Sequence, residues 1–384
     1  MEHYDLAIPV AELYILKRDC EIVKKFSQSK NPIIMVALIP FVSLFCFEAL
    51  DYFKKKDAPI AFEQSSRYSI KDVRNKMKFF DVRMNQLLNT IRNVDALQDK
   101  QFINYMKYSE IAYWNIHDNI GIYYDQNHHI ISNTHYSYYV FQDEKLIKKK
   151  LEQSSDLFED DPRIPPEEMR TYGYDIGFII GAISESLAVV GDFVTSDIHI
   201  ESGIIDSKDF NTNRICCGSD IYKIIKIFLL HVLSSINFVL YVLKKCTIRD
   251  SGWILRVEYI TYHYLLRRLS ELEAYIKKES SELNDYNLLE LFRELAIEIE
   301  GNELINSDFR NCMMHYGLKT EDDRILIKEE YFNLAIPLCG LVESIYNKSY
   351  WDFQSLIEDE LEKISEVLSC YLDLELRSPN KDIE

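Results

Sequence analysis

Three residue types suited to phosphate chemistry stand close together in this sequence of 384 residues. Arg310, Asn311 and His315 supply a permanent cation, an amide and an imidazole. A guanidinium binds phosphate oxygens through a fork of donors and stays charged at any working pH. An imidazole takes or gives a proton near neutrality. These groups suit cleavage of RNA, whose 2′-OH is an internal nucleophile, without a metal ion.

The residues around them predict a short helix. Ser307 is a suitable N-cap, Asp308 favours the first turn through the helix dipole, and Gly317 is a suitable stop. The helix is therefore expected to run from about Asp308 to Tyr316.

Helical geometry divides the side chains of this predicted helix between two faces. At about 100° per residue, Arg310, Asn311 and His315 share one arc, which also contains Met314. The opposite arc is expected to pack into a core, and it holds Phe309, Cys312, Met313 and Tyr316.

The pattern Arg310-Asn311-x3-His315 resembles the Arg-Asn-x3-His signature of the HEPN superfamily, the higher eukaryote and prokaryote nucleotide-binding domains. That resemblance covers about residues 219–376 and implies an all-α domain. Many HEPN proteins are metal-independent ribonucleases of toxin–antitoxin and antiviral systems, and their Arg and His commonly act in a cleft between two protomers.

For this chain the resemblance implies an endoribonuclease without cofactor or metal. His315 would act as general acid or base, Arg310 would stabilise the charged phosphorane, and Asn311 would orient His315 or the phosphate. Attack by the 2′-OH would leave 2′,3′-cyclic phosphate ends, in growth arrest or phage defence. The expected partners are an RNA substrate, a second copy in a homodimer, and an antitoxin or regulatory protein.

Other interpretations of these residues remain open. The alternative for the whole chain is a non-catalytic HEPN-like scaffold that binds a nucleotide or a protein. Arg256 and His263 form a second Arg/His pair, which we interpret as structural. His128, His129 and His135 lie near Asp125 and suit either a metal site or, as we expect, an exposed loop.

Charge and cysteine usage limit the function classes further. The net charge of −18, from 44 basic and 62 acidic residues, argues against broad binding to phosphate backbones, so an RNA site must be a local basic cleft. The eight cysteines show no C-x-x-C spacing, which indicates reduced thiols and a cytoplasmic protein.

Scarce glycine (11) and proline (9) favour helix throughout. The apolar run from Ile33 to Phe47 is shorter than the roughly 20 residues of a membrane span, so it predicts a core helix kinked at Pro40 and no membrane role. Thr134 to Phe141 is rich in tyrosine and predicts a strand that pairs with Ile130-Ile131.

The predicted fold is an all-α helical bundle with an additional, mostly helical N-terminal region. We expect four parts, namely an N-terminal helical region at 1–145, a linker at 146–166, a connecting helix and loop at 167–218, and an HEPN-like domain at 219–384. Helices are expected at 1–30, at 70–125 with a break near 95–99, and at 167–195, 219–246, 253–278, 287–300, 329–346 and 351–374.

Overall fold

The computed structural model confirms the all-α fold class. It describes residues 2–27, 32–66, 68–78, 82–108, 120–141, 167–189, 206–210, 220–246, 252–278, 286–297, 299–320, 322–333 and 336–374. The predicted linker at 146–166 lies outside these residues, and so do Trp114 to Asp118 at the end of the predicted 70–125 helices.

Helices of the N-terminal half follow the apolar pattern of the sequence. They are α1 (Glu2–Phe26), α2 (Pro32–Lys55), α3 (Ile70–Asn75), a 3-10 turn at Lys76–Lys78, and α4 (Met84–Tyr108). Helix α2 begins with Pro32 and contains Pro40. The break predicted near 95–99 is wrong, because α4 continues through it and buries Val94, Asp95 and Leu97.

A small antiparallel sheet, in the order β2-β1-β3, interrupts the helices. Its strands are β1 (Ile120–Tyr124), β2 (Ile130–Asn133) and β3 (Asp206–Phe210). The predicted strand at Thr134–Phe141 is wrong, because that segment is helix α5 and β2 pairs with β1 instead. The expected exposed loop is confirmed for His128, which lies exposed in the turn between β1 and β2, but it is wrong for His135, which is fully buried in α5.

The rest of the chain forms the helices from α7 onwards. They are α7 (Glu167–Ser186), α9 (Asp220–Asn237), a π-helical segment (Phe238–Leu243), α10 (Lys244–Cys246), α11 (Gly252–Lys278), α12 (Tyr286–Leu295), α13 (Ser307–Met314), α14 (Pro337–Tyr346) and α15 (Tyr350–Leu372). The helix predicted over 329–346 is shorter than expected, because only a 3-10 turn at Glu329–Tyr331 precedes α14.

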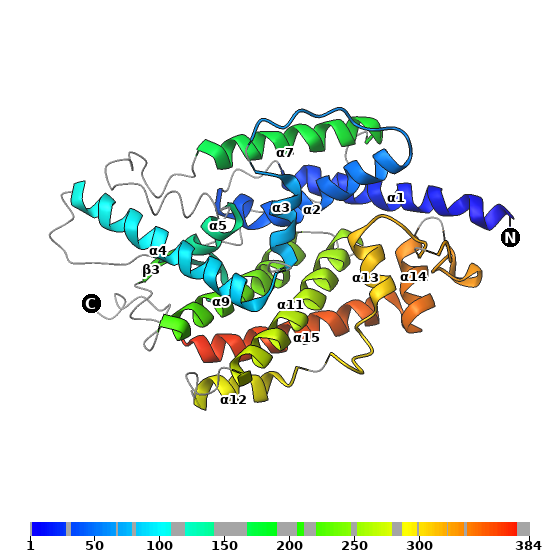
Figure 1. Ribbon diagram of the computed structural model, residues 1–384. Coiled ribbons are helices and arrows are strands. Elements are labelled where there is room, and N and C mark those ends of the chain that lie inside the picture. Colours follow the sequence, from blue (N-terminus) through cyan, green and yellow to red (C-terminus); the bar gives the residue numbers. More distant parts are fainter. Residues whose placement is uncertain are drawn as a thin grey trace.

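One hydrophobic core joins the two halves. Buried side chains from α1, α2 and α7 belong to the same cluster as those of α9, α11 and α15. Figure 1 shows α1, α2 and α7 along one side of the molecule, α9, α11 and α15 along the other, and α13 near the end of α11. The segment Asp220–Leu243 is long and apolar enough to span a membrane, but 89% of its most apolar window is buried within the protein.

Candidate functional site

Helix α13 carries the three candidate residues, and its ends differ from those predicted. The N-cap is Asn306, whose side-chain oxygen accepts a hydrogen bond from the Phe309 amide at 2.9 Å, so Ser307 lies inside the helix. The helix stops at Met314 because His315 is extended, with φ −118° and ψ 146°. The predicted end at Tyr316 is therefore wrong.

Contacts with α1 account for the early stop. The Tyr316 hydroxyl donates to the buried carboxylate of Asp19 at 2.8 Å, and the Leu318 amide donates to Glu12 at 3.0 Å. These bonds pull the chain away from the helix axis after Met314. Tertiary contacts thus override the stop signal at Gly317.

The apolar face of α13 is buried as expected. Phe309 is fully buried against the rings of Tyr259, Tyr346 and Phe353, with centroid distances of 4.6, 5.0 and 5.3 Å. Cys312, Met313 and Tyr316 are buried too. Met314, which was expected on the polar arc, is only 2% exposed.

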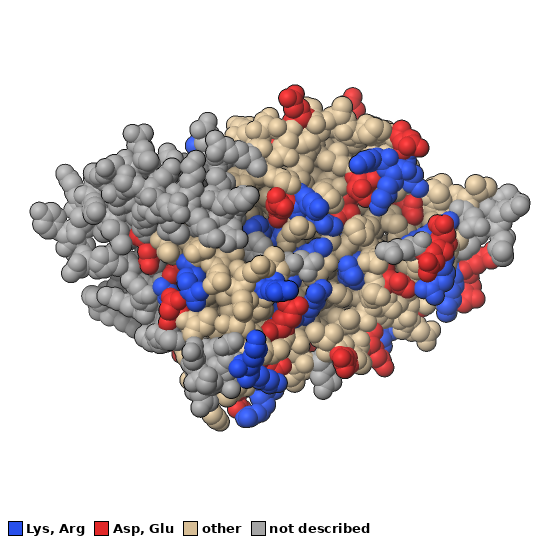
Figure 2. All heavy atoms as spheres, viewed as in Figure 1, with Lys and Arg blue, Asp and Glu red and all other residues tan. Residues whose placement is uncertain are grey.

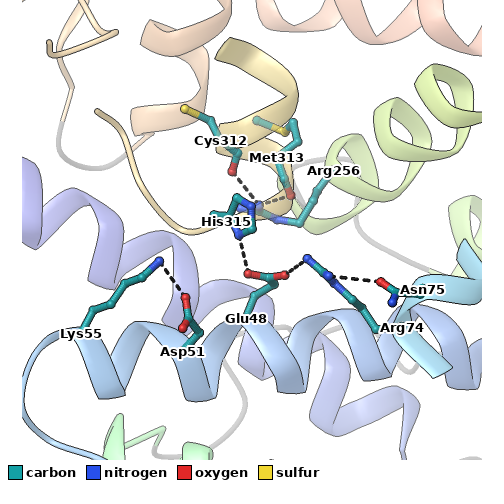
Figure 3. A network of polar contacts seen from close by, with 9 residues as sticks. All are labelled: Glu48, Asp51, Lys55, Arg74, Asn75, Arg256, Cys312, Met313 and His315. Atoms are coloured by element: carbon teal, nitrogen blue, oxygen red, sulfur yellow. Dashed lines mark hydrogen bonds and ion pairs between the residues drawn. The ribbon is translucent and has the colours of Figure 1, made fainter. Parts of the chain in front are cut away.

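His315 is held by a carboxylate from the N-terminal half. Its Nδ1 lies 2.6 Å from Oε2 of Glu48 on α2, and Oε1 of Glu48 accepts a hydrogen bond from Arg74 on α3 (Figure 3). The carboxylate only accepts, so Nδ1 carries the hydrogen and Nε2 is left to exchange protons. Glu48 is 2% exposed while the imidazole is 45% exposed, so a buried acid orients an accessible ring.

Asn311 and His315 line the same pocket, whose volume is about 420 Å³. Its other charged residues are Glu12, Glu48, Asp51, Asp308, Lys55, Lys56 and Lys319. Two of the lysines are paired, Lys55 with Asp51 at 2.7 Å and Lys56 with Glu12 at 3.5 Å. The pocket therefore lacks the excess of positive charge that a polyanion requires.

Arg310 faces a different element. It does not line the His315 pocket, and it lies within electrostatic range of Tyr259 and His263 on α11. Burial, reinforced by the guanidinium groups of Arg310 and Arg267, lowers the pKa of His263 to about 4. Within the described part of the chain Arg310 forms no ion pair, and its Nε is buried without a hydrogen bond.

Arg256, from the second Arg/His pair, stabilises the end of α13. The Arg256 guanidinium is buried and donates to Asp19 at 2.9 Å and to the carbonyl oxygens of Cys312 and Met313. It also lies over the Tyr316 ring, 4.4 Å from the centroid. Arg256 thereby satisfies carbonyl groups at the end of α13 that have no partner within the helix.

Arg310, Asn311 and His315 are the candidates that the sequence suggested, and the structure adds Glu48 and Arg74, which the sequence did not suggest. Glu48 is a single acid that directly follows the long apolar run from Ile33 to Phe47. A buried acid needs a partner, so its place on an apolar helix was the available signal. The partner itself could not be identified from local spacing.

Comparisons with known proteins add no relative. No protein-family model matches the chain, and neither a curated protein nor a solved structure is significantly similar to it. The assignment of a function therefore depends on the residues and their geometry.

Proposed function

We propose that this chain is a metal-independent endoribonuclease of the HEPN type, with His315 as the proton-transfer residue and Arg310 as the phosphate-binding cation. The observation that carries the proposal is the pairing of His315 with buried Glu48, 2.6 Å away, at a pocket that leaves the imidazole 45% exposed. A carboxylate that fixes the tautomer and angle of an accessible imidazole is a recurrent arrangement in general acid–base catalysis.

The proposed reaction is a transesterification within RNA. A neutral imidazole accepts the proton of the 2′-OH, the 2′ oxygen bonds to the adjacent phosphorus, and the bond from phosphorus to the 5′ oxygen breaks. A protonated imidazole returns a proton to the leaving 5′ oxygen. The products carry a 2′,3′-cyclic phosphate and a 5′-OH, and a guanidinium stabilises the charge that develops on the phosphoryl oxygens.

Assembly of this site is proposed to need two copies of the chain. Arg310 faces α11 whereas His315 faces α2, and the lysines Lys55 and Lys56 beside His315 already have acidic partners. A symmetric dimer that brings two α13 helices together would place Arg310 of one copy beside His315 of the other.

The direct test is incubation of purified protein with total RNA in EDTA, with the ends of the products identified. The expected result is cleavage to 2′,3′-cyclic phosphate ends by the parent and its loss in Arg310→Ala and in His315→Ala. Cleavage by both folded variants at the parent rate would refute the assignment. Folded parent protein that binds RNA without cutting it would favour the non-catalytic scaffold.

Mixing the two inactive variants tests the composite site. A heterodimer of Arg310→Ala with His315→Ala contains one site with both residues intact, so random exchange should restore about one quarter of the parent's sites. If both residues came from the same copy, the heterodimer would contain no complete site. Continued inactivity after verified subunit exchange would therefore exclude the composite arrangement.

Growth arrest or phage defence, a cytoplasmic location and control by an antitoxin or regulatory protein belong to the same proposal. The described cysteines, Cys20, Cys46, Cys312, Cys339 and Cys370, are all free thiols, which agrees with a reducing compartment. Induced expression of the parent and of His315→Ala in a bacterial host would test growth arrest, which only the parent should cause.

A further inference from the structure

An open groove of about 660 Å³ lies between α11 and the segment that leads into α4. It is separate from the His315 pocket and shares no lining residue with it. Its charged residues are Arg83, Arg267, Arg268, Glu271 and Lys278. Figure 2 shows Lys and Arg side chains gathered across the middle of the face on which α11 and α13 lie.

The charge of this groove is opposite to that of the chain. Four cations and one carboxylate line it, although the whole sequence has 62 acidic and 44 basic residues. Arg83 and Lys278 are exposed, and neither forms an ion pair with any residue that the structure describes. A concave surface with unneutralised cations concentrates its field and attracts a polyanion.

A buried arginine fixes the shape of the groove. The Arg268 side chain is 2% exposed and donates hydrogen bonds to the carbonyl oxygens of Lys78 at 3.3 Å and Val82 at 2.9 Å. It also pairs with Glu271. These bonds tie the backbone next to Arg83 to α11, so the cations on the two walls are held at a set separation before any ligand arrives.

The positive field extends from the groove towards Arg310. Arg267 lines the groove and lies one helical turn from His263 on α11. Both Arg267 and Arg310 act electrostatically on His263. From His263 to Lys278 the helix rises by about 22 Å. Arg267, which pairs with Glu271 at 3.1 Å, lies between Lys278 and the turn of α11 beside Arg310.

We infer that this basic groove, lined by Arg83, Arg267, Arg268 and Lys278, binds the sugar–phosphate backbone of single-stranded RNA and leads the strand to Arg310. Tyr275 also lines the groove and supplies an aromatic ring suited to stacking with a base. The choice of RNA rests on the proposed function, whereas the binding of a phosphate backbone rests on the groove itself.

The test measures RNA binding apart from cleavage. Full-length protein carrying His315→Ala is titrated against a fluorescent oligouridine of about 20 nucleotides, a length that spans a typical single-strand groove. Binding is followed by anisotropy between about 50 and 200 mM salt. The same background then receives Arg83→Ala with Lys278→Ala. The matched control is Lys277→Ala, which removes a neighbouring cation that pairs with Glu273 outside the groove.

The double variant should bind about tenfold more weakly, and its plot of log affinity against log salt should lose a slope of about 0.7 for each phosphate contact removed. The Lys277→Ala control should bind like the background. Both groove residues are exposed, and Arg83→Gln with Lys278→Gln provides a second variant that removes the two charges but keeps polar side chains at both positions. Unchanged affinity and slope in folded double variants would overturn the inference, as would a background protein that binds no RNA.

Competition with polyglutamate of equal charge decides the class of ligand. If polyglutamate displaces the RNA at an equal concentration of charge, RNA is excluded as the preferred ligand and an acidic peptide takes its place. Failure of the proposed function has a different signature, in which RNA binds in the groove but the His315-intact parent does not cut it. If both proposals hold, the groove variants in the His315-intact chain should raise KM and leave kcat close to that of the parent.

Discussion

Arg256 donates a hydrogen bond to the backbone carbonyl of Cys312 over 3.0 Å, so a side chain of α11 closes the end of the helix that carries the candidate site. The same guanidinium pairs with Asp19 on α1. One buried cation thus links α1, α11 and α13. It fixes the direction in which the chain leaves Met314 and hence the position of His315.

Replacement of Arg256 by alanine should therefore destabilise the fold. The substitution leaves the buried Asp19 carboxylate without its cation, and such changes typically cost about 3 to 5 kcal/mol. Urea unfolding of Arg256→Ala measures the loss. Arg324→Ala is the control, because Arg324 forms an exposed pair with Asp308 and its loss should cost less than about 1 kcal/mol. Equal stability of the two variants would contradict the proposed support role.

Glu48→Gln should lower kcat of RNA cleavage and leave KM nearly unchanged. The amide has the size of the carboxylate but lacks the charge that stabilises an imidazolium, so we expect a loss of about 10²-fold or more. Asp51→Asn is the matched control, since Asp51 lines the same pocket and pairs with Lys55 instead of His315. Folded Glu48→Gln that cleaves RNA as fast as Asp51→Asn would exclude Glu48 as a positioning residue.

Arg310→Ala should reduce cleavage by about 10²- to 10³-fold, the loss typical for a donor that stabilises a transition state. Arg310→Lys should restore only part of the activity, because an ammonium lacks the guanidinium fork. Neither change breaks an ion pair within the described residues, so melting temperatures should stay near that of the parent. The control is Arg293→Ala on α12, which removes an exposed cation paired with Glu290. Full activity in Arg310→Ala would eliminate the residue from the site.

Acid should weaken the fold through a buried histidine pair. His135 Nδ1 lies 3.0 Å from His231 Nε2, and burial lowers the pKa of His135 from 6.5 to about 4 and lowers that of His231 as well. Since the unfolded chain binds these protons more readily, stability is fully present above pH 6.5 and falls as the pH drops towards 4. For His135 the loss is about 3 kcal/mol.

Urea unfolding across this pH range measures the effect. His135→Phe should flatten the dependence of the unfolding free energy on pH, whereas the exposed His128→Asn should leave its slope as in the parent. Asparagine suits the positive φ of 64° at that control position. A pH dependence unaffected by His135→Phe would assign the acid sensitivity to other groups.

The hydrophobic periodicity of the sequence correctly predicted those elements whose burial follows from the local pattern of apolar residues. The expected helix from Trp253 to Lys278 differs from α11 by one residue, because its apolar stripe agrees with its burial in the core. Phe309 was placed on the buried face of α13 for the same reason. The prediction for Thr134–Phe141 was wrong because its tyrosines favour strands. In helix α5, Tyr136 and Tyr139 are instead buried against His231 of α9.

The candidate site was predicted only in part, because its geometry depends on long-range contacts. The spacing of Arg310 and His315 suggested one shared face on a regular helix. The extended backbone at His315 changes that geometry, and it follows from bonds to Glu12 and Asp19 near the start of the chain. Glu48 could not be linked to His315 from sequence, because 267 positions separate them.

That separation has a consequence for protein synthesis. Glu48 leaves the ribosome long before His315, so the pairing of imidazole and carboxylate forms only when most of the chain has been translated. Truncated or nascent chains that end before α13 contain Glu48 without His315. Under the proposed ribonuclease function, the chain would thus stay inactive towards the messenger RNA and ribosomes that produce it until its translation is nearly finished.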